Sequence, residues 1–328
     1  MNLEIMAPAG NFECLNAAIQ GGANSVYFGV GNLNMRSHSA NNFSSADLQQ
    51  VCDICRENGV KSYLTLNIVL YDEDIEPMKE ALQAAKAAGI TAVIASDMAA
   101  ITYARELGIE VHISTQLSIS NSQSLKFYAQ YADVIVLARE LNLGQVKEIK
   151  ATIDREQIKG PSGRLLEIEM FCHGALCMAI SGKCYLSLHE YGASANRGSC
   201  YQLCRRGYSV TDLETGNTLE IDNKYIMSPK DLCTIEFMDK IIDAGVTVFK
   251  IEGRARSAEY VKTVARCYRD AADAVLAGKY TPEYASELKE RLSTVFNRGF
   301  WDGYYQDAGR VVRSEVHGNK ARKSKQNS

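Results

Sequence analysis

The sequence predicts an α/β fold, a (β/α)8 barrel of the TIM type with a long cysteine-rich insertion after its seventh strand. Short apolar runs alternate along the chain with segments of helical periodicity, which is typical of a parallel sheet covered by helices. Eight such runs occur, the number of strands in this barrel. An open, doubly wound sheet stays the alternative, because a strand count from sequence is uncertain by about one or two.

The expected elements follow directly from these runs. The eight strands span residues 3–8, 25–29, 62–67, 92–96, 110–114, 133–137, 166–171 and 247–251. Helices are expected between them, for example at 74–88 and 98–107, and after the last strand at 255–277 and 280–294. Glycines stand where a left-handed residue is needed between a helix and the next strand, at Gly59, Gly89, Gly108 and Gly245. The aromatic segment 296–305 is expected to pack back on the barrel or to line its mouth.

The seventh unit differs from the others. About 75 residues separate Phe171 from Thr247, far more than the typical connection of about 4–6 residues. We therefore predict a single barrel domain over 1–305 that includes an insertion at 172–246. A charged C-terminal tail, 306–328, is expected to be partly disordered.

Composition narrows the function classes. The chain has 328 residues, is 46% hydrophobic and 23% charged, and carries a net charge of −3, so no overall basic field indicates a nucleic-acid partner. The N-terminal residues do not resemble a signal peptide, and no apolar run is long enough to cross a bilayer. We expect a cytoplasmic protein without a membrane partner.

Five of the ten cysteines lie between residues 169 and 206. In a reducing compartment, thiols gathered in this way are more often metal ligands or catalytic groups than disulfide partners. Cys177, Cys184, Cys200 and Cys204 are spaced C-x6-C-x15-C-x3-C, without the tight C-x2-C pairs of structural zinc sites. Loops that contain glycine suit an iron–sulfur cluster, while zinc and unligated thiols stay open as alternatives.

The other cysteines and the histidines have plainer interpretations. Cys172 is an idle thiol or a fifth candidate ligand, and its role is left open. The remaining cysteines are expected to pack in helices, at Cys14, Cys52, Cys55, Cys233 and Cys267. His112 is expected in the core, whereas His173, beside the cysteine cluster, is a candidate catalytic residue.

Polar residues follow the predicted strands, at the carboxyl ends where TIM barrels bind their substrates. The candidate substrate-binding residues are Arg36, Asn67, Gln116 and Arg139. The further candidate catalytic residues are Glu140, Glu252 and Arg254, which could equally form salt bridges that steady the mouth. The sequence has no H-E-x-x-H and no G-x-S-x-G motif. Adjacent strand residues point to opposite faces, so Cys172 and His173 make a poor nucleophile pair.

Several motifs resemble a known family. The run Glu169-x-Phe171-x2-Gly174-Ala175-Leu176-Cys177-x4-Gly182-x-Cys184-x-Leu186-Ser187 matches the signature of the collagenase-like peptidase family of unknown catalytic type, family U32. Met6-Ala-Pro-Ala-Gly10, Ser228-Pro-Lys-Asp-Leu232 and Lys250-Ile-Glu-Gly-Arg254 are similar to its other blocks, so the resemblance spans nearly the whole chain.

The resemblance implies two different activities. Members labelled collagenase imply a peptidase. Related members carry a four-iron four-sulfur cluster and support oxygen-independent hydroxylation of tRNA, of rRNA or of a ubiquinone precursor, some with prephenate as the donor. On that resemblance Cys177, Cys184, Cys200 and Cys204 would be the ligands, and arginines at the mouth would bind a small carboxylate donor.

We therefore expect cluster-dependent hydroxylation of an RNA nucleobase, with a peptidase as the first alternative. Ubiquinone-precursor hydroxylation and a non-catalytic iron–sulfur partner are further alternatives. A homo- or hetero-oligomer is compatible with the sequence. This sequence does not contain the long C-terminal extension of the larger RNA-modifying relatives. Because that extension could bind RNA in those relatives, RNA binding is not implied by the resemblance alone.

Overall fold

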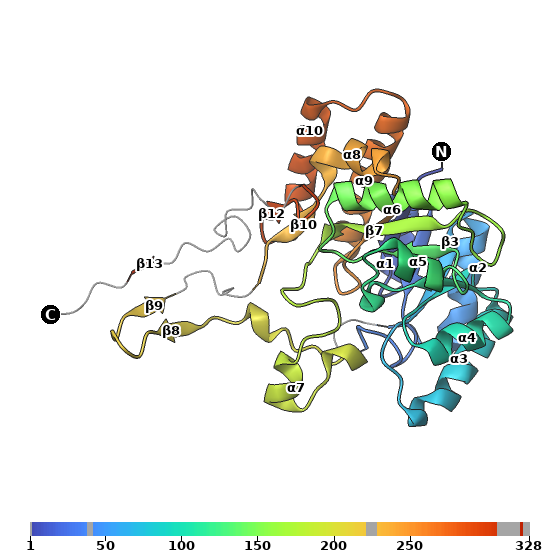
Figure 1. Ribbon diagram of the computed structural model, residues 1–328, viewed down its shortest axis with the longest axis horizontal. Helices are drawn as coiled ribbons and strands as arrows, with labels where there is room; N and C mark the ends of the chain where they lie inside the picture. The colour runs from blue at the N-terminus through green and yellow to red at the C-terminus, as the bar shows by residue number, and fades with distance from the viewer. Residues whose placement is uncertain (1, 38–41, 221–227, 307–321, 324–328) are drawn as a thin grey trace.

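Eight parallel strands close into a barrel, as the sequence predicts (Figure 1). The computed structural model describes residues 2–37, 42–220, 228–306 and 322–323. The barrel strands are β1 (Glu4–Pro8), β2 (Ser25–Phe28), β3 (Lys61–Leu66), β4 (Ala92–Ala95), β5 (Glu110–Ile113), β6 (Val134–Val136), β7 (Glu167–Gly174) and β11 (Val248–Ile251). Strand β11 pairs in parallel with both β1 and β7, which closes the sheet and excludes the open alternative.

Helices cover the outside of this barrel, and most of them follow a strand directly. They are α1 (Phe12–Gln20), α2 (Leu48–Glu57), α3 (Ile75–Ala88), α4 (Met98–Glu106), α5 (Ser122–Tyr128), α6 (Leu143–Glu156), α8 (Met238–Asp243), α9 (Ala258–Leu276) and α10 (Pro282–Ser293). Short polar residues begin several of them; the Asp97 carboxylate, for example, accepts a hydrogen bond from the Ala99 N–H. The four predicted helix-ending glycines all have positive φ, such as 78° at Gly89.

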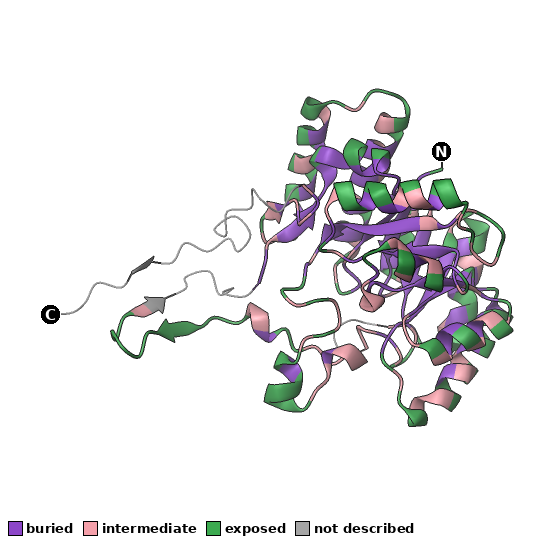
Figure 2. Ribbon diagram, in the orientation of Figure 1, coloured by how far each residue is buried: buried purple, intermediate pink, exposed green. Residues whose placement is uncertain are grey.

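The core has two parts. Apolar side chains from strands and helices fill the layer between barrel and helices. A smaller set fills the barrel interior, at Met6, Tyr27, Tyr63, Ala92, Ile94, Val134 and Val248. The strands are buried whereas the outer helix faces are exposed, as Figure 2 shows. The interior also holds a buried ion pair, since the Lys250 Nζ lies 2.8 Å from Glu169 Oε1.

The insertion begins beyond β7 and crosses the barrel mouth. It contains α7 (Leu186–Tyr191), the hairpin β8 (Ser209–Thr211) and β9 (Thr218–Glu220), strand β10 (Asp231–Cys233) and then α8. The insertion also contains single 3-10 turns at Ala195–Arg197, Leu203–Arg205 and Ile235–Phe237. Three more 3-10 turns lie in the barrel loops, at Ser45–Asp47, Asp72–Asp74 and Thr115–Leu117. The β8–β9 hairpin projects away from the barrel, and β8 is exposed, as is most of α7 (Figure 1, Figure 2).

Strand β10 returns the chain to the barrel by pairing antiparallel with the end of β7. Strand β12 (Phe300–Trp301) then pairs with β10, and β13 (Arg322–Lys323) pairs with β9. The aromatic segment thus packs back on the barrel; the buried Tyr305 hydroxyl donates to the Phe171 carbonyl oxygen at 2.7 Å. Cys233 lies on β10, so its predicted helical position is wrong, although the thiol is buried as expected.

Two further sequence predictions meet the structure here. No helix in the described ranges is long and apolar enough to cross a membrane. The predicted tail 306–328 lies outside the described residues except at 306 and 322–323, so its disorder stays a prediction.

Candidate functional site

Two cavities lie at the carboxyl ends of the barrel strands, beneath the insertion. The inner cavity, about 110 Å³, has a floor of strand residues, Tyr27, Thr65, Phe171 and Lys250, and a roof formed by residues 179–182. The outer cavity, about 170 Å³, is lined by Leu176, Met178, Arg205, Arg256 and Arg298, among others. Both are lined by Arg36, Cys177, Ala179, Cys184, Cys200 and Glu252. Because one water needs roughly 10–15 Å³, the inner cavity has room for a small organic molecule.

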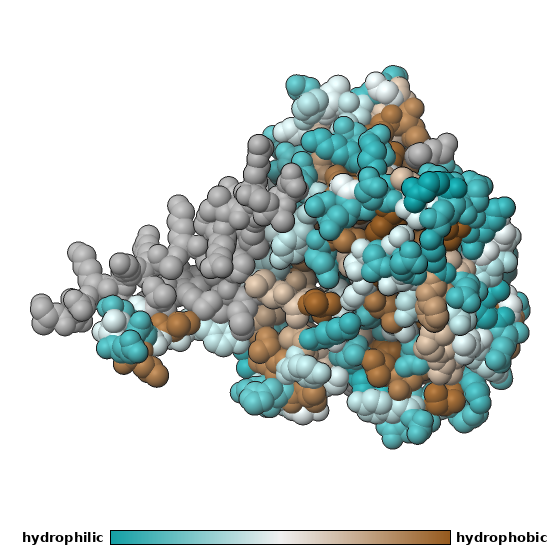
Figure 3. Space-filling view, viewed as in Figure 1, coloured by the Kyte–Doolittle hydropathy of each residue, from teal (hydrophilic) through white to brown (hydrophobic). Residues whose placement is uncertain are grey.

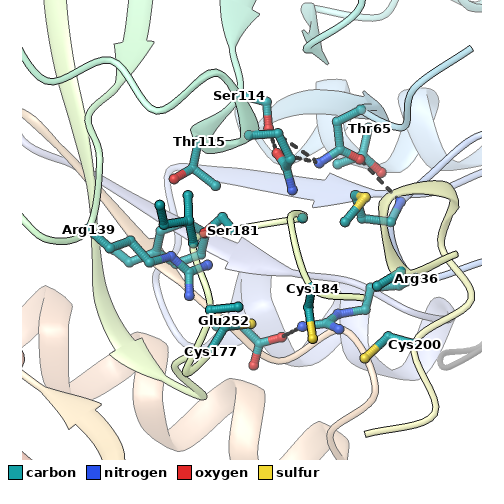
Figure 4. Close-up of a pocket in the computed structure, with 18 of the residues that line it drawn as sticks. Arg36, Thr65, Ser114, Thr115, Arg139, Cys177, Ser181, Cys184, Cys200 and Glu252 are labelled. Atoms are coloured by element: carbon teal, nitrogen blue, oxygen red, sulfur yellow. Dashed lines mark hydrogen bonds and ion pairs between the residues drawn. The ribbon is translucent and has the colours of Figure 1, made fainter. Parts of the chain in front are cut away.

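The four predicted ligand cysteines face this region together. All four line the outer cavity, and all except Cys204 also line the inner one. Figure 4 shows Cys177, Cys184 and Cys200 beside the ion pair of Arg36 and Glu252. Burial raises the pKa of the Cys204 thiol, Arg205 lowers it, and the other three thiols raise it further. The thiols of Cys177, Cys184 and Cys200 are therefore close enough to Cys204 to change its pKa.

Close packing of the insertion against the loop after β2 positions Cys200. Gly198 has φ of 86°, and a Cβ there would stand 2.2 Å from Ser37 Oγ and 2.5 Å from the Asn34 carbonyl oxygen. Only glycine therefore fits at this crossing. Cys200 follows two residues later and lines the cavities with Arg36, which the β2 loop supplies.

The spacing of these thiols bears on the kind of group that they suit. Within the described parts of the chain, no three Cys, His, Asp or Glu side chains are close enough to hold a metal ion. Four thiolates about 2.3 Å from a single zinc ion would lie within about 4 Å of one another. In a cluster, iron and bridging sulfide stand between the cysteines, so a more open set is compatible with it. The ligand set itself stays a prediction.

The pair of Arg36 and Glu252 connects the two cavities. Arg36 Nη2 lies 2.8 Å from Glu252 Oε1. Burial would lower the pKa of Arg36, but Glu252 and then the thiols of Cys177 and Cys200 raise it above the ordinary value. Burial would likewise raise the pKa of Glu252, and Arg36 outweighs that effect and lowers it. Glu252 is therefore a carboxylate at neutral pH, suited to accept a hydrogen bond.

Amide and hydroxyl groups form one wall of the inner cavity. Asn67 Nδ2 donates to Ser114 Oγ at 3.3 Å and to Gln116 Oε1 at 3.4 Å. Its Oδ1 accepts from the Met35 N–H at 3.3 Å, which ties this wall to the β2 loop. Such side chains offer both donors and acceptors to a polar ligand.

Cationic side chains form the floor and another part of the wall. The Arg139 guanidinium stacks 3.8 Å from the centre of the Phe171 ring. Arg254 Nη1 donates to Asn34 Oδ1 and to Thr65 Oγ1, both at 2.9 Å. Burial lowers the pKa of Arg254 to about 10, so the side chain stays charged at neutral pH. Three arginines and Lys250 around so small a space indicate an anionic ligand.

The structure brings six of the eight non-cysteine candidates together, namely Arg36, Asn67, Gln116, Arg139, Glu252 and Arg254. It does not bring Glu140 or His173 there. Glu140 is exposed and lines neither cavity. His173 is buried among the rings of Tyr260, Tyr268 and Phe300. Burial lowers the pKa of His173 to about 3, so its ring is neutral.

Cys172 and His112 also lie away from the cavities. The Cys172 thiol is buried and lies 3.4 Å from the Lys250 carbonyl oxygen, a position that suits packing. His112 lies in the barrel interior as predicted, with its ring 4.6 Å from that of Tyr63. No described histidine lines either cavity, so neither cavity contains a cysteine–histidine nucleophile pair formed from described residues.

Sequence reasoning missed Lys250, Tyr27, Thr65, Thr115 and Phe171 as lining residues. A signal for Lys250 was present, because it lies near the carboxyl end of the predicted eighth strand, where TIM barrels bind their substrates. Tyr27 and Phe171 appear in the sequence only as apolar strand residues, so nothing marks them as part of the site.

The fold and the site together define a TIM-barrel protein with a binding site at its mouth that is lined by cysteines and arginines. The chain belongs to Peptidase family U32, whose sequence profile matches residues 10–313. This confirms the family resemblance of the motifs.

Relatives carry two kinds of name. A protein named collagenase from Porphyromonas gingivalis is 61% identical over 304 residues, covering 93% of this chain and 73% of that protein. A tRNA hydroxylation protein of Bacillus subtilis is 35% identical over 310 residues, covering 92% and 71%. A 23S rRNA 5-hydroxycytidine synthase of Escherichia coli is 37% identical over 278 residues, covering 84% of this chain and 40% of that protein.

Proposed function

We propose that this protein is an iron–sulfur enzyme that hydroxylates a nucleobase of tRNA or rRNA without molecular oxygen. The observation that carries the proposal is the set of four cysteines that line one cavity at the barrel mouth. Support also comes from relatives named for tRNA hydroxylation and for rRNA 5-hydroxycytidine synthesis. A four-iron four-sulfur cluster bound by these cysteines would supply one-electron chemistry.

The protein residues have separate tasks in this proposal. Arg139 and Arg254 would bind a small carboxylate donor, prephenate or a similar acid, through charge-assisted hydrogen bonds. Asn67 and Gln116 present amide groups to the same cavity, where they suit the edge of a base. Glu252, held ionised by Arg36, would accept a hydrogen bond from the bound donor or base.

The surface around the mouth suits an RNA partner. Residues 177–208 contain four basic side chains, Lys183, Arg197, Arg205 and Arg206, and one acidic side chain, Glu190, in a chain whose net charge is −3. Exposed tyrosines lie among them, with Tyr185 76% and Tyr201 57% exposed. The Arg206 guanidinium lies 5.3 Å from the Tyr191 ring centre. Polar and apolar side chains are interleaved where α7 lies in Figure 3.

Aromatic and cationic side chains of this kind bind single-stranded nucleic acid by stacking and by charge. We define Tyr185, Tyr191, Tyr201, Arg205 and Arg206 as the tyrosine–arginine rim. A base would have to leave its stack to pass from this rim into the cavity.

Two measurements test the proposal. Anaerobically purified protein is expected to contain iron and sulfide, and Cys177→Ala is expected to lose them while Cys55→Ala, a buried thiol of α2, keeps them. Mass spectrometry of tRNA and rRNA nucleosides is expected to show one hydroxylated nucleoside missing from a deletion strain. Wild type should restore it and Cys177→Ala should not. An unchanged nucleoside profile, or an iron-free native protein, contradicts the proposal.

Peptidase activity is the second candidate, because a relative 61% identical to this chain is named collagenase. A gelatin-cleavage assay of the same preparations separates the two functions. Cleavage by wild type and Cys177→Ala alike, with an unchanged nucleoside profile, would favour the peptidase.

A further inference from the structure

We propose that Lys250 forms an imine with the carbonyl group of a small 2-oxo acid bound at the floor of the inner cavity. The inference concerns Lys250, which the proposed hydroxylation does not use, and it depends on neither the cluster nor RNA.

The position of the amine is the first argument. Lys250 lies on β11, is 5% exposed and lines the inner cavity. Its Nζ lies 4.8 Å from the ring centre of Tyr27 and 5.4 Å from that of Phe171, and both rings also line the cavity. A ligand in the cavity therefore meets a single amine between two aromatic rings, an environment that suits a nucleophilic lysine.

The carboxylate of Glu169 gives this amine a proton acceptor. Glu169 Oε1 lies 2.8 Å from Lys250 Nζ, and Glu169 is fully buried. Its Oε2 makes no hydrogen bond to any described residue and lies 3.9 Å from His112 Nδ1. Burial lowers the pKa of Lys250, with Glu169 opposing that shift, so loss of a proton is easier here than in water.

Unsatisfied polar groups beside the lysine indicate where a carboxylate would bind. Arg139 Nε and Thr115 Oγ1 are buried and have no hydrogen-bond partner among the described residues. Both residues line the inner cavity, and Figure 4 shows them on the same side of it. Arg139 stacks on the same Phe171 ring that Lys250 faces. Buried donors without partners are rare, so these two indicate a polar ligand.

An amine next to a carboxylate-binding arginine selects an oxo acid, a compound that has both a carbonyl and a carboxylate, and the 2-oxo acids are the smallest ketones of this class that fit a cavity of about 110 Å³. The Lys250 ammonium gives a proton to Glu169, and the free amine attacks the carbonyl carbon to form a C–N bond. One of the two remaining amine protons then passes to the carbonyl oxygen, which becomes a hydroxyl group. Glu169 returns the proton to the departing hydroxyl group, and water leaves. One ammonium and one ketone thus give one iminium and one water, with no oxidation or reduction.

Borohydride trapping tests the inference. Full-length protein is incubated with pyruvate and sodium borohydride, and intact mass followed by peptide mapping is expected to find one reduced adduct, on Lys250. Lactate, which has the carboxylate but no carbonyl, is expected to give none. Lys250→Arg keeps the charge and is expected to abolish the adduct. Lys61→Arg is the matched control, because Lys61 also pairs with a buried glutamate, Glu4 at 2.7 Å, and is expected to keep it.

Arg139→Gln is expected to raise the pyruvate concentration for half-maximal trapping about tenfold, the effect of one charge-assisted hydrogen bond. Circular dichroism of Lys250→Arg verifies that it is folded. Absence of an adduct in wild type, an adduct that persists in folded Lys250→Arg, or mapping to another lysine overturns the inference. The trapping assay measures a lysine adduct and needs neither iron nor RNA, so failure of the cluster proposal and failure of this inference are distinguishable.

Discussion

Arg36 and Glu252 form a 2.8 Å ion pair that lines both cavities, so it lies between the predicted cluster ligands and the arginine-lined floor. Arg36 comes from the loop after β2, whereas Glu252 follows β11. This ion pair thus joins two loops that are far apart in the sequence. It fixes one positive and one negative side chain at the boundary between the two cavities.

Breaking this pair is expected to destabilise the fold. The side chains of Arg36 and Glu252 are 27% and 13% exposed, so the pair is partly buried. Exposed ion pairs contribute little to stability, whereas breaking a fully buried pair is strongly destabilising, and we expect an effect between these two. We expect Arg36→Met and Glu252→Gln each to lower the free energy of unfolding by about 2 kcal/mol. The double variant should lose less than the sum, because no charge is left alone. Urea denaturation of all four proteins measures the coupling; strict additivity would show that the pair does not interact.

The same pair predicts a pH dependence. Arg36 lowers the pKa of Glu252 in the folded protein below its ordinary value of 4.5. The stabilisation is therefore fully present above 4.5 and is lost as the pH falls through the lower, folded-state pKa. Melting temperatures of wild type and Glu252→Gln should differ at pH 7 and converge in acid. A difference that stays constant down to the acid limit would contradict this assignment.

The tyrosine–arginine rim predicts how RNA binding responds to mutation. Loss of one stacked base removes roughly 1–3 kcal/mol, so Tyr185→Ala and Tyr201→Ala are each expected to weaken binding of a single-stranded RNA about 5- to 150-fold. Replacing Arg205 and Arg206 by glutamine should in addition reduce the salt dependence of binding. Fluorescence anisotropy at two salt concentrations measures both effects.

Phe127 supplies the control for the rim, since it is 52% exposed on α5 and lines neither cavity. Phe127→Ala is expected to bind RNA as wild type does. If it weakens binding as much as Tyr201→Ala, the rim is not the binding surface.

The barrel was predictable because its strands are local signals. Each is a short apolar run between glycines and helices, and each of the eight predicted runs overlaps a barrel strand. Cys233 was misplaced because β10 has only three residues, too few to show a period. Glu140 follows Arg139 directly, but only Arg139 lines a cavity, and no local pattern tells which of two adjacent loop residues turns inward.

The missed part of the site depends on contacts between distant residues. Lys250 and Glu169 are 81 positions apart and meet only because β11 pairs with β7. His173 appeared functional because it adjoins the cysteines, yet the rings that enclose it come from α9 and β12. Contacts of this kind form only when the barrel closes. The sequence predicts that the barrel closes, but it does not predict which side chains then come into contact.

Gly198 gives the sharpest test of how the insertion is held over the mouth. An alanine there would bring its Cβ to 2.2 Å from Ser37 Oγ and 2.5 Å from the Asn34 carbonyl oxygen, at φ of 86°. We expect Gly198→Ala to displace the loop that carries Cys200. Hydrogen exchange should rise over residues 195–205 while the barrel keeps its protection. On the proposed function, anaerobically purified Gly198→Ala should also contain less iron.

Gly192→Ala is the matched control, since Gly192 has φ of 63° but a Cβ there meets nothing within 4 Å. Equal exchange in the two variants would show that left-handed strain, and not the contact with the β2 loop, determines where Cys200 lies.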